Sequence, residues 1–249
     1  MPETGQNIVL SIAGFDPCGG AGILADVQTL QQCKVQGMAV QTALTAQNEE
    51  KVDKVVWHSW DEIKCQIEVL LNLYQFEVVK IGIIENLETL RQVVDLLISH
   101  RPDIKIVWDP ILKSSSGFDF LKNLEEQQLS DVISKIHLIT PNLWEFEILT
   151  QVLKEQPFST HVLLKGGHVE GNDTSDKLID LEGNKIQIAG QRIIGKSKHG
   201  TGCVLSSAIA AGLCKGMKLK TACTFAKRYV ESYLKSGVNK LGAHYTIEI

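Results

Sequence analysis

Residues 8–30 read IVLSIAGFDPCGGAGILADVQTL, in which an apolar run of strand length, a glycine-rich turn and a helical pattern follow one another. The run at residues 8–13 is rich in Val, Ile and Leu on both faces, which is typical of strands buried within a parallel sheet. A strand followed by a helix is the repeating unit of doubly wound α/β folds, and these bind ligands beyond the carboxyl ends of their strands. The turns that leave the strands are therefore the expected place for a functional site.

Similar units recur along the chain, because apolar runs of strand length alternate with patterns in which apolar residues recur at spacings of three and four. The expected strands are residues 8–13, 38–46, 78–83, 104–108, 137–140 and 161–165, the expected helices are 60–74, 87–99, 203–215 and 218–235, and the runs 177–181 and 185–194 predict a hairpin. We predict an α/β fold in which a doubly wound, mainly parallel sheet is flanked by helices, with a small β-hairpin. No linker or repeat interrupts this pattern, so residues 1–249 are expected to form a single domain.

The composition excludes several classes of protein. A chain of 249 residues with 44% apolar and 22% charged residues is long enough for one large core, and its net charge of −4 without a basic stripe gives no sign of a nucleic-acid partner. The first apolar run has only about seven residues, whereas about 20 are needed to span a bilayer, so no membrane partner is expected. Six cysteines without a CxxC pair or a matching His spacing indicate neither a zinc site nor a disulfide framework. We expect a cytoplasmic protein with free thiols.

The turn after the first strand, residues 14–22, contains four glycines. Glycine lets backbone approach a ligand closely or adopt positive φ. Residues 20–25 also match the short dinucleotide fingerprint GxGxxA, but the fingerprint should begin almost at the end of the strand, and here Phe15 to Gly19 intervene. We therefore prefer a ligand-cradling loop to a nicotinamide or flavin site, and a plain tight turn remains the alternative.

A second glycine-containing turn, His199-Gly200-Thr201-Gly202-Cys203, opens an expected helix. Backbone N–H groups are unpaired at the start of a helix, where the helix dipole is positive, so this turn predicts a site for phosphate or a developing anion. The same field should acidify the thiol of Cys203 and make it a base or a nucleophile. The alternative for Cys203 is a buried core cysteine.

Seven motifs in order carry a resemblance to a known family. They are IAGxDPxGGAGIxAD (12–26), TALxAQN (42–48), KIG (80–82), DP (109–110), TPNxxE (140–145), KGGH (165–168) and HGTGC (199–203). Over about residues 8–235 the chain resembles the hydroxymethylpyrimidine and phosphomethylpyrimidine kinases of thiamine biosynthesis, a ribokinase-like family related to pyridoxal kinases. The resemblance implies ATP-dependent phosphorylation of 4-amino-5-hydroxymethyl-2-methylpyrimidine, of its monophosphate, or of both, with Mg²⁺ as cofactor. A homodimer is the expected assembly.

The resemblance also implies roles for individual residues, which suit a reaction that depends on positioning and electrostatic stabilisation. The implied catalytic residues are Cys203 as general base, Lys165 at the transferring phosphoryl group, and Gly200, Thr201 and Gly202 as the anion hole. Those that bind nucleotide are Lys165, Asn142, His199 and Thr201, and those that hold metal are Asp109, Asn142 and Glu145. Those that bind substrate are Gly14, Ala21, Asp26, Gln47, Ile83 and Ile111, with the amide of Gln47 on the pyrimidine ring nitrogen and amino group. Lys113 and Ser114, Ser115 and Ser116 are expected to border the phosphate region.

Several of these residues have a plainer alternative. Lys165 could be a solvated lysine at a strand end, and Asp26 a solvated or helix-capping acid. Asn142 and Glu145 also match the N-cap and N3 positions of a capping box. Each of these alternatives makes a different prediction for burial and hydrogen bonding.

The chain departs from the family pattern in three places, and three further functions stay open. Only 19 residues separate Glu145 from Lys165, Phe15 and Cys18 replace small hydroxylic residues, and the tail after residue 237 differs. A pyridoxal or pyridoxine kinase would use a similar hydroxymethyl acceptor. The motifs also allow a cysteine hydrolase built on His199 and Cys203, or a nonenzymatic nucleotide-binding module.

Overall fold

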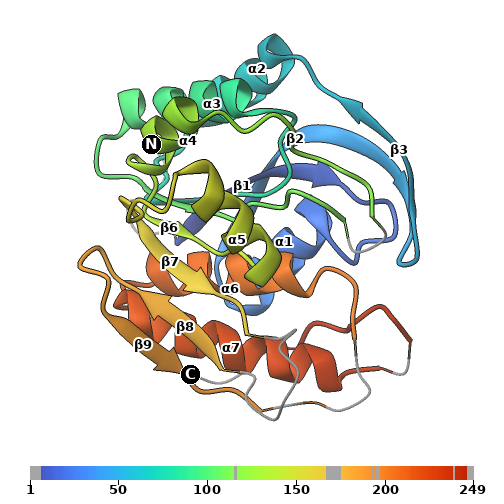
Figure 1. Cartoon of the computed structure of the whole chain (residues 1–249). Helices are drawn as coiled ribbons and strands as arrows, with labels where there is room; N and C mark the ends of the chain where they lie inside the picture. The colour runs from blue at the N-terminus through green and yellow to red at the C-terminus, as the bar shows by residue number, and fades with distance from the viewer. Residues whose placement is uncertain are drawn as a thin grey trace.

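The computed structural model describes residues 7–114, 117–166, 175–191, 193, 197–237 and 239–245, and in them a nine-stranded sheet lies between two layers of helices (Figure 1). The strands are β1 Ile8–Phe15, β2 Gln36–Gln47, β3 Val52–Trp57, β4 Val78–Ile81, β5 Lys105–Trp108, β6 Leu138–Ile139, β7 His161–Leu164, β8 Asp176–Ile179 and β9 Lys185–Ile188. The helices are α1 Gly22–Gln32, α2 Trp60–Leu71, α3 Leu87–His100, α4 Glu126–Ile133, α5 Leu143–Val152, α6 Thr201–Cys214 and α7 Leu219–Lys235. The predicted α/β fold is confirmed.

The strand order is β3-β2-β1-β4-β5-β6-β7-β8-β9, and the parallel strands are β2, β1, β4, β5, β6 and β7. The chain passes from β1 to β2 on one side and later returns to place β4 on the other side of β1. This reversal makes the carboxyl ends of β1 and β4 a topological switch point, where open α/β sheets bind ligands. The fold therefore directs the site to the loops after β1, β4 and their neighbours.

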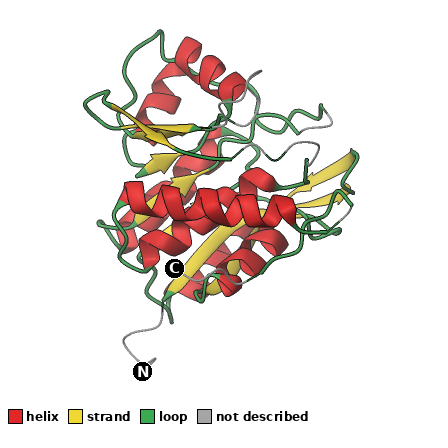
Figure 2. Cartoon of the chain, turned by 90° about the horizontal axis from the view of Figure 1, so that it is seen from below, coloured by secondary structure: helices red, strands yellow, loops and turns green. Residues whose placement is uncertain are grey.

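The two faces of the sheet have separate cores. Apolar side chains of α2, α3, α4 and α5 cover one face, and those of α1, α6 and α7 cover the other, the side that is turned toward the viewer in Figure 2. Every residue of α6 from Cys203 to Cys214 is buried. A helix that is apolar on all sides is expected where neighbours surround it, so α6 can hold its N-terminus firmly at the switch point.

Three details of the fold differ from the sequence-based expectation, and one agrees with it. Strand β3 was not predicted because it is an antiparallel edge strand, half solvent-facing, whose Asp53 and Lys54 interrupt the apolar pattern. Helix α4 is short and was also missed. The hairpin strands β8 and β9 are shorter than predicted, and residues 192 and 194, which the expected second strand included, lie outside the described residues. The short interval after Glu145 holds the remainder of α5 and strand β7, as expected.

Candidate active site

The predicted catalytic and metal residues meet at the carboxyl ends of the central strands. Lys165, which follows β7, donates from Nζ to Asp109 Oδ1 at 2.9 Å, and Asp109 follows β5. A β-carbon added to Gly202 would lie 3.4 Å from both Lys165 Nζ and Asp109 Oδ2. The start of α6 therefore faces a lysine and a carboxylate that other strands supply.

Lys165 is not a solvated strand-end lysine, because only 16% of its side chain is exposed. Its Nζ also lies 3.9 Å from Glu145 Oε2. Burial opposes the charge of this ammonium, but Asp109 and Glu145 outweigh burial and raise the pKa of Lys165 above its ordinary value. The lysine stays charged at neutral pH and presents a cation beside the first turn of α6.

Asn142 and Glu145 form the capping box that their spacing allowed. The Asn142 N–H donates to Glu145 Oε2 at 2.7 Å, and the Glu145 N–H donates to Asn142 Oδ1 at 2.8 Å, at the start of α5. Burial raises the pKa of Glu145 to about 7, although Lys165 acts in the opposite direction. The carboxyl group is thus both a helix cap and a buried titratable neighbour of Lys165.

Asp109 has one engaged and one free carboxylate oxygen. Oδ1 accepts from Thr140 Oγ1 at 3.0 Å and from Lys165, whereas Oδ2 is buried and has no hydrogen-bond partner within the described part of the chain. An unpartnered buried carboxylate oxygen is costly unless a cation or a donor reaches it. This orphaned oxygen beside Glu145 fits a hard cation such as Mg²⁺, which prefers carboxylate oxygens.

Helix α6 begins through a tight contact between the two glycine-containing turns. Gly200, the N-cap, has φ 71° and ψ 14°, and a β-carbon on it would overlap the carbonyl oxygen of Gly20. Glycine is therefore required here both for the left-handed conformation and for the close approach. Thr201 turns its hydroxyl back to the Lys198 carbonyl oxygen at 2.7 Å. Because the N-cap is a glycine, no side chain of the N-cap residue caps the first-turn N–H groups of α6.

The thiol of Cys203 differs from the sequence-based expectation. Its side chain is buried at the third residue of α6, and burial raises its pKa to about 11, even though Lys80 and a hydrogen bond from the Gly22 N–H lower it. The prediction that the Cys203 thiol is acidic is therefore wrong. Desolvation of the sulfur exceeds the stabilisation of the thiolate by Lys80 and the Gly22 N–H, and this balance could not be read from the sequence.

A buried ion pair that the sequence analysis missed lies behind Cys203. Lys80 Nζ is 2.7 Å from Asp26 Oδ2, and neither side chain is exposed. Ser11 Oγ donates to the same oxygen at 2.6 Å, and Ser207 Oγ donates to Oδ1 at 2.7 Å. Burial disfavours the charge of Lys80, but Asp26 holds the lysine pKa above its ordinary value.

Asp26 is thus neither a solvated nor a capping acid, and its carboxylate lies within this network instead of lining an open pocket. Lys80 interrupts the apolar strand VVKI. A lysine within an otherwise apolar strand is the sequence signal that could have indicated a buried charge at Lys80.

The predicted substrate-binding residues are brought together in part. A β-carbon on Gly14 would overlap the side chain of Ile83, and Thr42 Oγ1 donates to the Ile83 carbonyl oxygen at 2.8 Å. Gln47 ends β2 beside an irregularity in its pairing with β3, and its side chain is half-buried. Ile111 is also half-buried, and its N–H donates to the Asp109 carbonyl oxygen at 2.8 Å.

The remaining glycines of the first turn serve the backbone itself. Gly22 has φ 58°, and a β-carbon there would overlap the Gly14 carbonyl oxygen, so the GxGxxA match reflects close packing within the loop. Lys113 forms an ion pair with Asp119 at 3.6 Å. Ser115 and Ser116, like Gly167 and His168 of the KGGH motif, lie outside the described residues.

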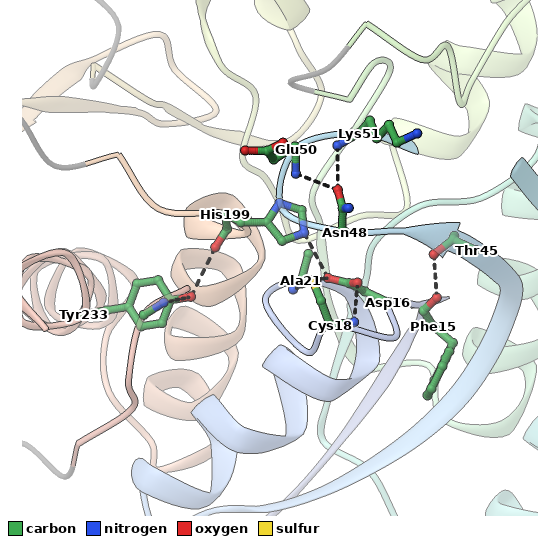
Figure 3. A network of polar contacts seen from close by, with 11 residues as sticks. Phe15, Asp16, Cys18, Ala21, Thr45, Asn48, Glu50, Lys51, His199 and Tyr233 are labelled. Atoms are coloured by element: carbon green, nitrogen blue, oxygen red, sulfur yellow. Dashed lines mark hydrogen bonds and ion pairs between the residues drawn. The ribbon is translucent and has the colours of Figure 1, made fainter. Parts of the chain in front are cut away.

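Asp16 and His199 join the two glycine-containing turns (Figure 3). The distance from His199 Nε2 to Asp16 Oδ2 is 2.9 Å, and the Ala21 N–H donates to the same oxygen at 2.8 Å. Tyr233 Oη donates to the His199 carbonyl oxygen at 3.1 Å. Burial acts to raise the pKa of Asp16, but the hydrogen bonds from His199 and Cys18 prevail and lower it to about 2. The two turns are therefore tied together by a charged carboxylate.

A mainly parallel α/β sheet that presents a helix N-terminus to a charged lysine and buried carboxylates is the arrangement expected of a ribokinase-like phosphotransferase. Comparison with known proteins gives the family: the model for phosphomethylpyrimidine kinase matches residues 16–248, and the chain belongs to this family. The resemblance found in the sequence is confirmed, and so is the prediction of a kinase. None of the helices in the described part of the chain is long and apolar enough to cross a membrane.

Individual relatives agree with this assignment. The chain is 37% identical over 254 residues to the hydroxymethylpyrimidine/phosphomethylpyrimidine kinase of Aquifex aeolicus, with 96% of this chain and 98% of the relative covered. Identity to the protein of the same name from Rhizobium meliloti is 34% over 244 residues, covering 92% and 91%.

Solved structures extend the comparison to the fold. The phosphomethylpyrimidine kinase of Clostridium difficile 630 superposes with a TM-score of 0.74 at 31% identity, covering 92% of this chain and 99% of that one. The pyridoxal kinase of Bacillus subtilis, solved as an ADP complex, has a TM-score of 0.80 at 24% identity and covers 96% and 97%, which shows a shared fold.

Proposed function

We propose that this chain transfers the γ-phosphoryl group of ATP to the hydroxymethyl group of 4-amino-5-hydroxymethyl-2-methylpyrimidine and to the phosphate of its monophosphate. The observation that carries the proposal is the meeting of Gly202 at the start of α6 with Lys165 Nζ and Asp109 Oδ2, each 3.4 Å from a β-carbon position on this glycine. Anion-binding amides opposite a cation and a carboxylate are the parts that phosphoryl transfer requires.

In this proposal the transferring group meets Lys165 on one side and the amides of Thr201, Gly202 and Cys203 on the other. Negative charge spreads over the phosphoryl oxygens in the transition state, and groups that are already oriented toward it stabilise it without reorganisation. Lys165 is held in place by Asp109 and Glu145 before substrate arrives. His199, Thr201 and Asn142 complete the proposed nucleotide site.

The orphaned Asp109 Oδ2 and the neighbouring Glu145 are the residues that would hold Mg²⁺. The ion would supply positive charge to the phosphate oxygens of the nucleotide. Asn142 would contribute by capping α5, because its side chain oxygen already accepts the Glu145 N–H and thereby fixes the position of that carboxyl group.

Cys203 is the proposed general base, and Lys80 is the neighbouring charge that favours its thiolate. A base must exist as thiolate when it removes the proton of the substrate hydroxyl, but burial holds the thiol pKa at about 11. The Lys80 ammonium, fixed by Asp26 at 2.7 Å, favours the thiolate over the thiol. The small thiolate fraction at neutral pH limits the rate, and the higher basicity of the sulfur offsets this only in part.

The acceptor is tested directly by comparing three substrates with Mg-ATP: the hydroxymethylpyrimidine, its monophosphate and pyridoxal. We expect the highest kcat/KM with the two pyrimidines. A higher kcat/KM with pyridoxal would assign the chain to pyridoxal phosphorylation instead, and absence of ATP consumption with all three would overturn the proposed function. Gly14 and Ile83, which are in contact, are the proposed floor of the acceptor pocket.

We also propose that the protein acts as a homodimer in the cytoplasm, where ATP and Mg²⁺ are available. The edge ribbon of β2 and β3 supports an assembly, because Leu44 and Val56 are paired across the two strands and are 48% and 46% exposed. Adjoining apolar side chains that are exposed at the edge of a sheet are candidates for a contact surface. Sedimentation of wild type and of Leu44→Lys tests this: a dimer that becomes a monomer in the variant is expected, and a wild-type monomer would contradict the assembly.

A further inference from the structure

Asp16, Cys18 and His199 place three different metal-binding atoms around one point between the two glycine-containing turns (Figure 3). Asp16 Oδ2 lies 3.3 Å from Cys18 Sγ and 2.9 Å from His199 Nε2, and all three atoms lie within 4.8 Å of one another. The ligands come from segments 183 residues apart in the sequence. This distance in sequence is why Cys and His spacing gave no indication of a metal site.

The chemistry and the spacing of this group suit zinc. Zn²⁺ takes Cys sulfur, His nitrogen and carboxylate oxygen at roughly 2.0–2.3 Å, so tetrahedral ligand atoms lie roughly 3.3–3.8 Å apart. The observed separations of 2.9 and 3.3 Å reach this arrangement after small movements of the side chains. Three protein ligands with a fourth position for water is a common zinc arrangement.

The carboxylate is already oriented by groups outside the cluster, and the site is open to solvent. The Cys18 N–H donates to Asp16 Oδ1 at 3.0 Å and the Ala21 N–H donates to Oδ2 at 2.8 Å, while Tyr233 holds the backbone of His199. Hydrogen bonds of this kind orient the side chains that coordinate a metal and increase the affinity of the site. Asp16 is buried, but Cys18 and His199 are partly exposed, so an ion can reach the cluster.

We propose that Asp16, Cys18 and His199 form a binding site for one Zn²⁺ ion, separate from the Asp109 and Glu145 cluster and sharing His199 with the proposed nucleotide site. Binding breaks the S–H bond of Cys18, and its proton passes to solvent. His199 must present the lone pair of Nε2, so its contact with Asp16 is exchanged for coordination and its ring proton resides on Nδ1. The oxidation state of the metal does not change. The bound ion would cross-link the loop after β1 to the loop before α6.

Zn²⁺ binding is measured by titration calorimetry on the full chain without Mg²⁺ or nucleotide, and Co²⁺ serves as a spectroscopic probe for sulfur coordination. The test variant is Cys18→Ser, which keeps the side-chain size and the capacity to donate to Asp16. The matched control is Cys65→Ser on α2, because Cys65 is exposed and shares a surface hollow with His58 and Glu62. Neither cysteine belongs to the proposed catalytic machinery, and circular dichroism verifies that both variants fold.

We expect one Zn²⁺ per chain in wild type and in Cys65→Ser, with an affinity at least about 10- to 100-fold weaker in Cys18→Ser, since even outer-shell partners have effects of this size. A sulfur-to-Co²⁺ charge-transfer band should be present in wild type and absent in Cys18→Ser. The thermal midpoint of wild type, but not of Cys18→Ser, should rise with Zn²⁺, because the ion binds the folded state. Equal Zn²⁺ affinity in Cys18→Ser and wild type, loss of binding in Cys65→Ser, or no binding by wild type would each overturn the site.

Discussion

Lys165 and Asp109 form an ion pair in which Nζ donates to Oδ1 at 2.9 Å, while the second oxygen of the same carboxylate is buried without a hydrogen-bond partner among the described residues. One oxygen of Asp109 therefore holds the lysine and the other remains available to a second cation. Both groups face Gly202 at the start of α6. The arrangement holds the Lys165 ammonium and the start of α6 at the place where the proposed reaction develops negative charge.

Lys165→Ala should lower kcat more than it raises KM. The ammonium stabilises charge that grows in the transition state, and loss of one such preorganised group costs about 10²- to 10³-fold in rate. Initial rates at saturating hydroxymethylpyrimidine and Mg-ATP measure the effect, with Lys122→Ala, an exposed lysine, as the control. An effect confined to KM would contradict the role of Lys165 in the transition state.

Turnover should require Mg²⁺ or a close substitute. The Asp109→Asn variant should need a higher Mg²⁺ concentration to reach half of its maximal rate. The amide has the size of the carboxylate but lacks its charge, so the orphaned Oδ2 position would no longer attract a cation. Rates measured across a Mg²⁺ titration should shift to higher concentrations for this variant, whereas the exposed-surface variant Asp131→Asn should follow wild type. Full wild-type activity in excess chelator would exclude the metal requirement.

Much of the fold could be predicted from the sequence, because buried strands and helix termini are marked by residues that lie close together in the chain. The run at residues 8–13 lies within β1, and the HGTGC motif lies at the start of α6, where strand burial and helix termini leave clear traces. Strand β3 was missed because an antiparallel edge strand needs no continuous apolar run. Lys80 stands out in an apolar strand, but its partner Asp26 lies 54 positions away, and no sequence pattern specifies which carboxylate pairs with it. The acidity of Cys203 was predicted wrongly because its depth of burial depends on the packing of α6.

Asp16 should stabilise the fold above pH 4 and lose this contribution in acid. Its folded pKa of about 2 lies below the ordinary 3.8, so ionised Asp16 favours the folded state, and protonation removes the effect as pH falls from about 4 to about 2. The shift corresponds to about 2 kcal/mol. The free energy of unfolding of metal-free Asp16→Asn should be lower than that of wild type by this amount at pH 7.

The difference between wild type and Asp16→Asn should shrink toward zero near pH 2, measured by urea unfolding at several pH values. The exposed-surface variant Asp103→Asn controls for the general loss of a carboxylate. A difference that stays constant between pH 7 and pH 2.5 would mean that packing, and not the hydrogen bonds to the Asp16 carboxylate, accounts for the loss.

Cys203→Ala should reduce kcat by about 10²- to 10⁴-fold, the usual contribution of a positioned general base, with nucleotide affinity nearly unchanged. Because burial places the thiol pKa at about 11, the wild-type rate should rise with pH from 7 to 9 as the thiolate fraction increases. Cys203→Asp should retain more activity than Cys203→Ala and reach its full rate at lower pH, since burial raises the pKa of either group but the ordinary pKa of a carboxyl, about 3.9, lies far below that of a thiol. Profiles of kcat against pH for the three proteins, with saturating hydroxymethylpyrimidine and Mg-ATP, test these expectations together. A loss below about threefold in Cys203→Ala, far less than a base contributes, would leave Cys203 as a packing residue of α6.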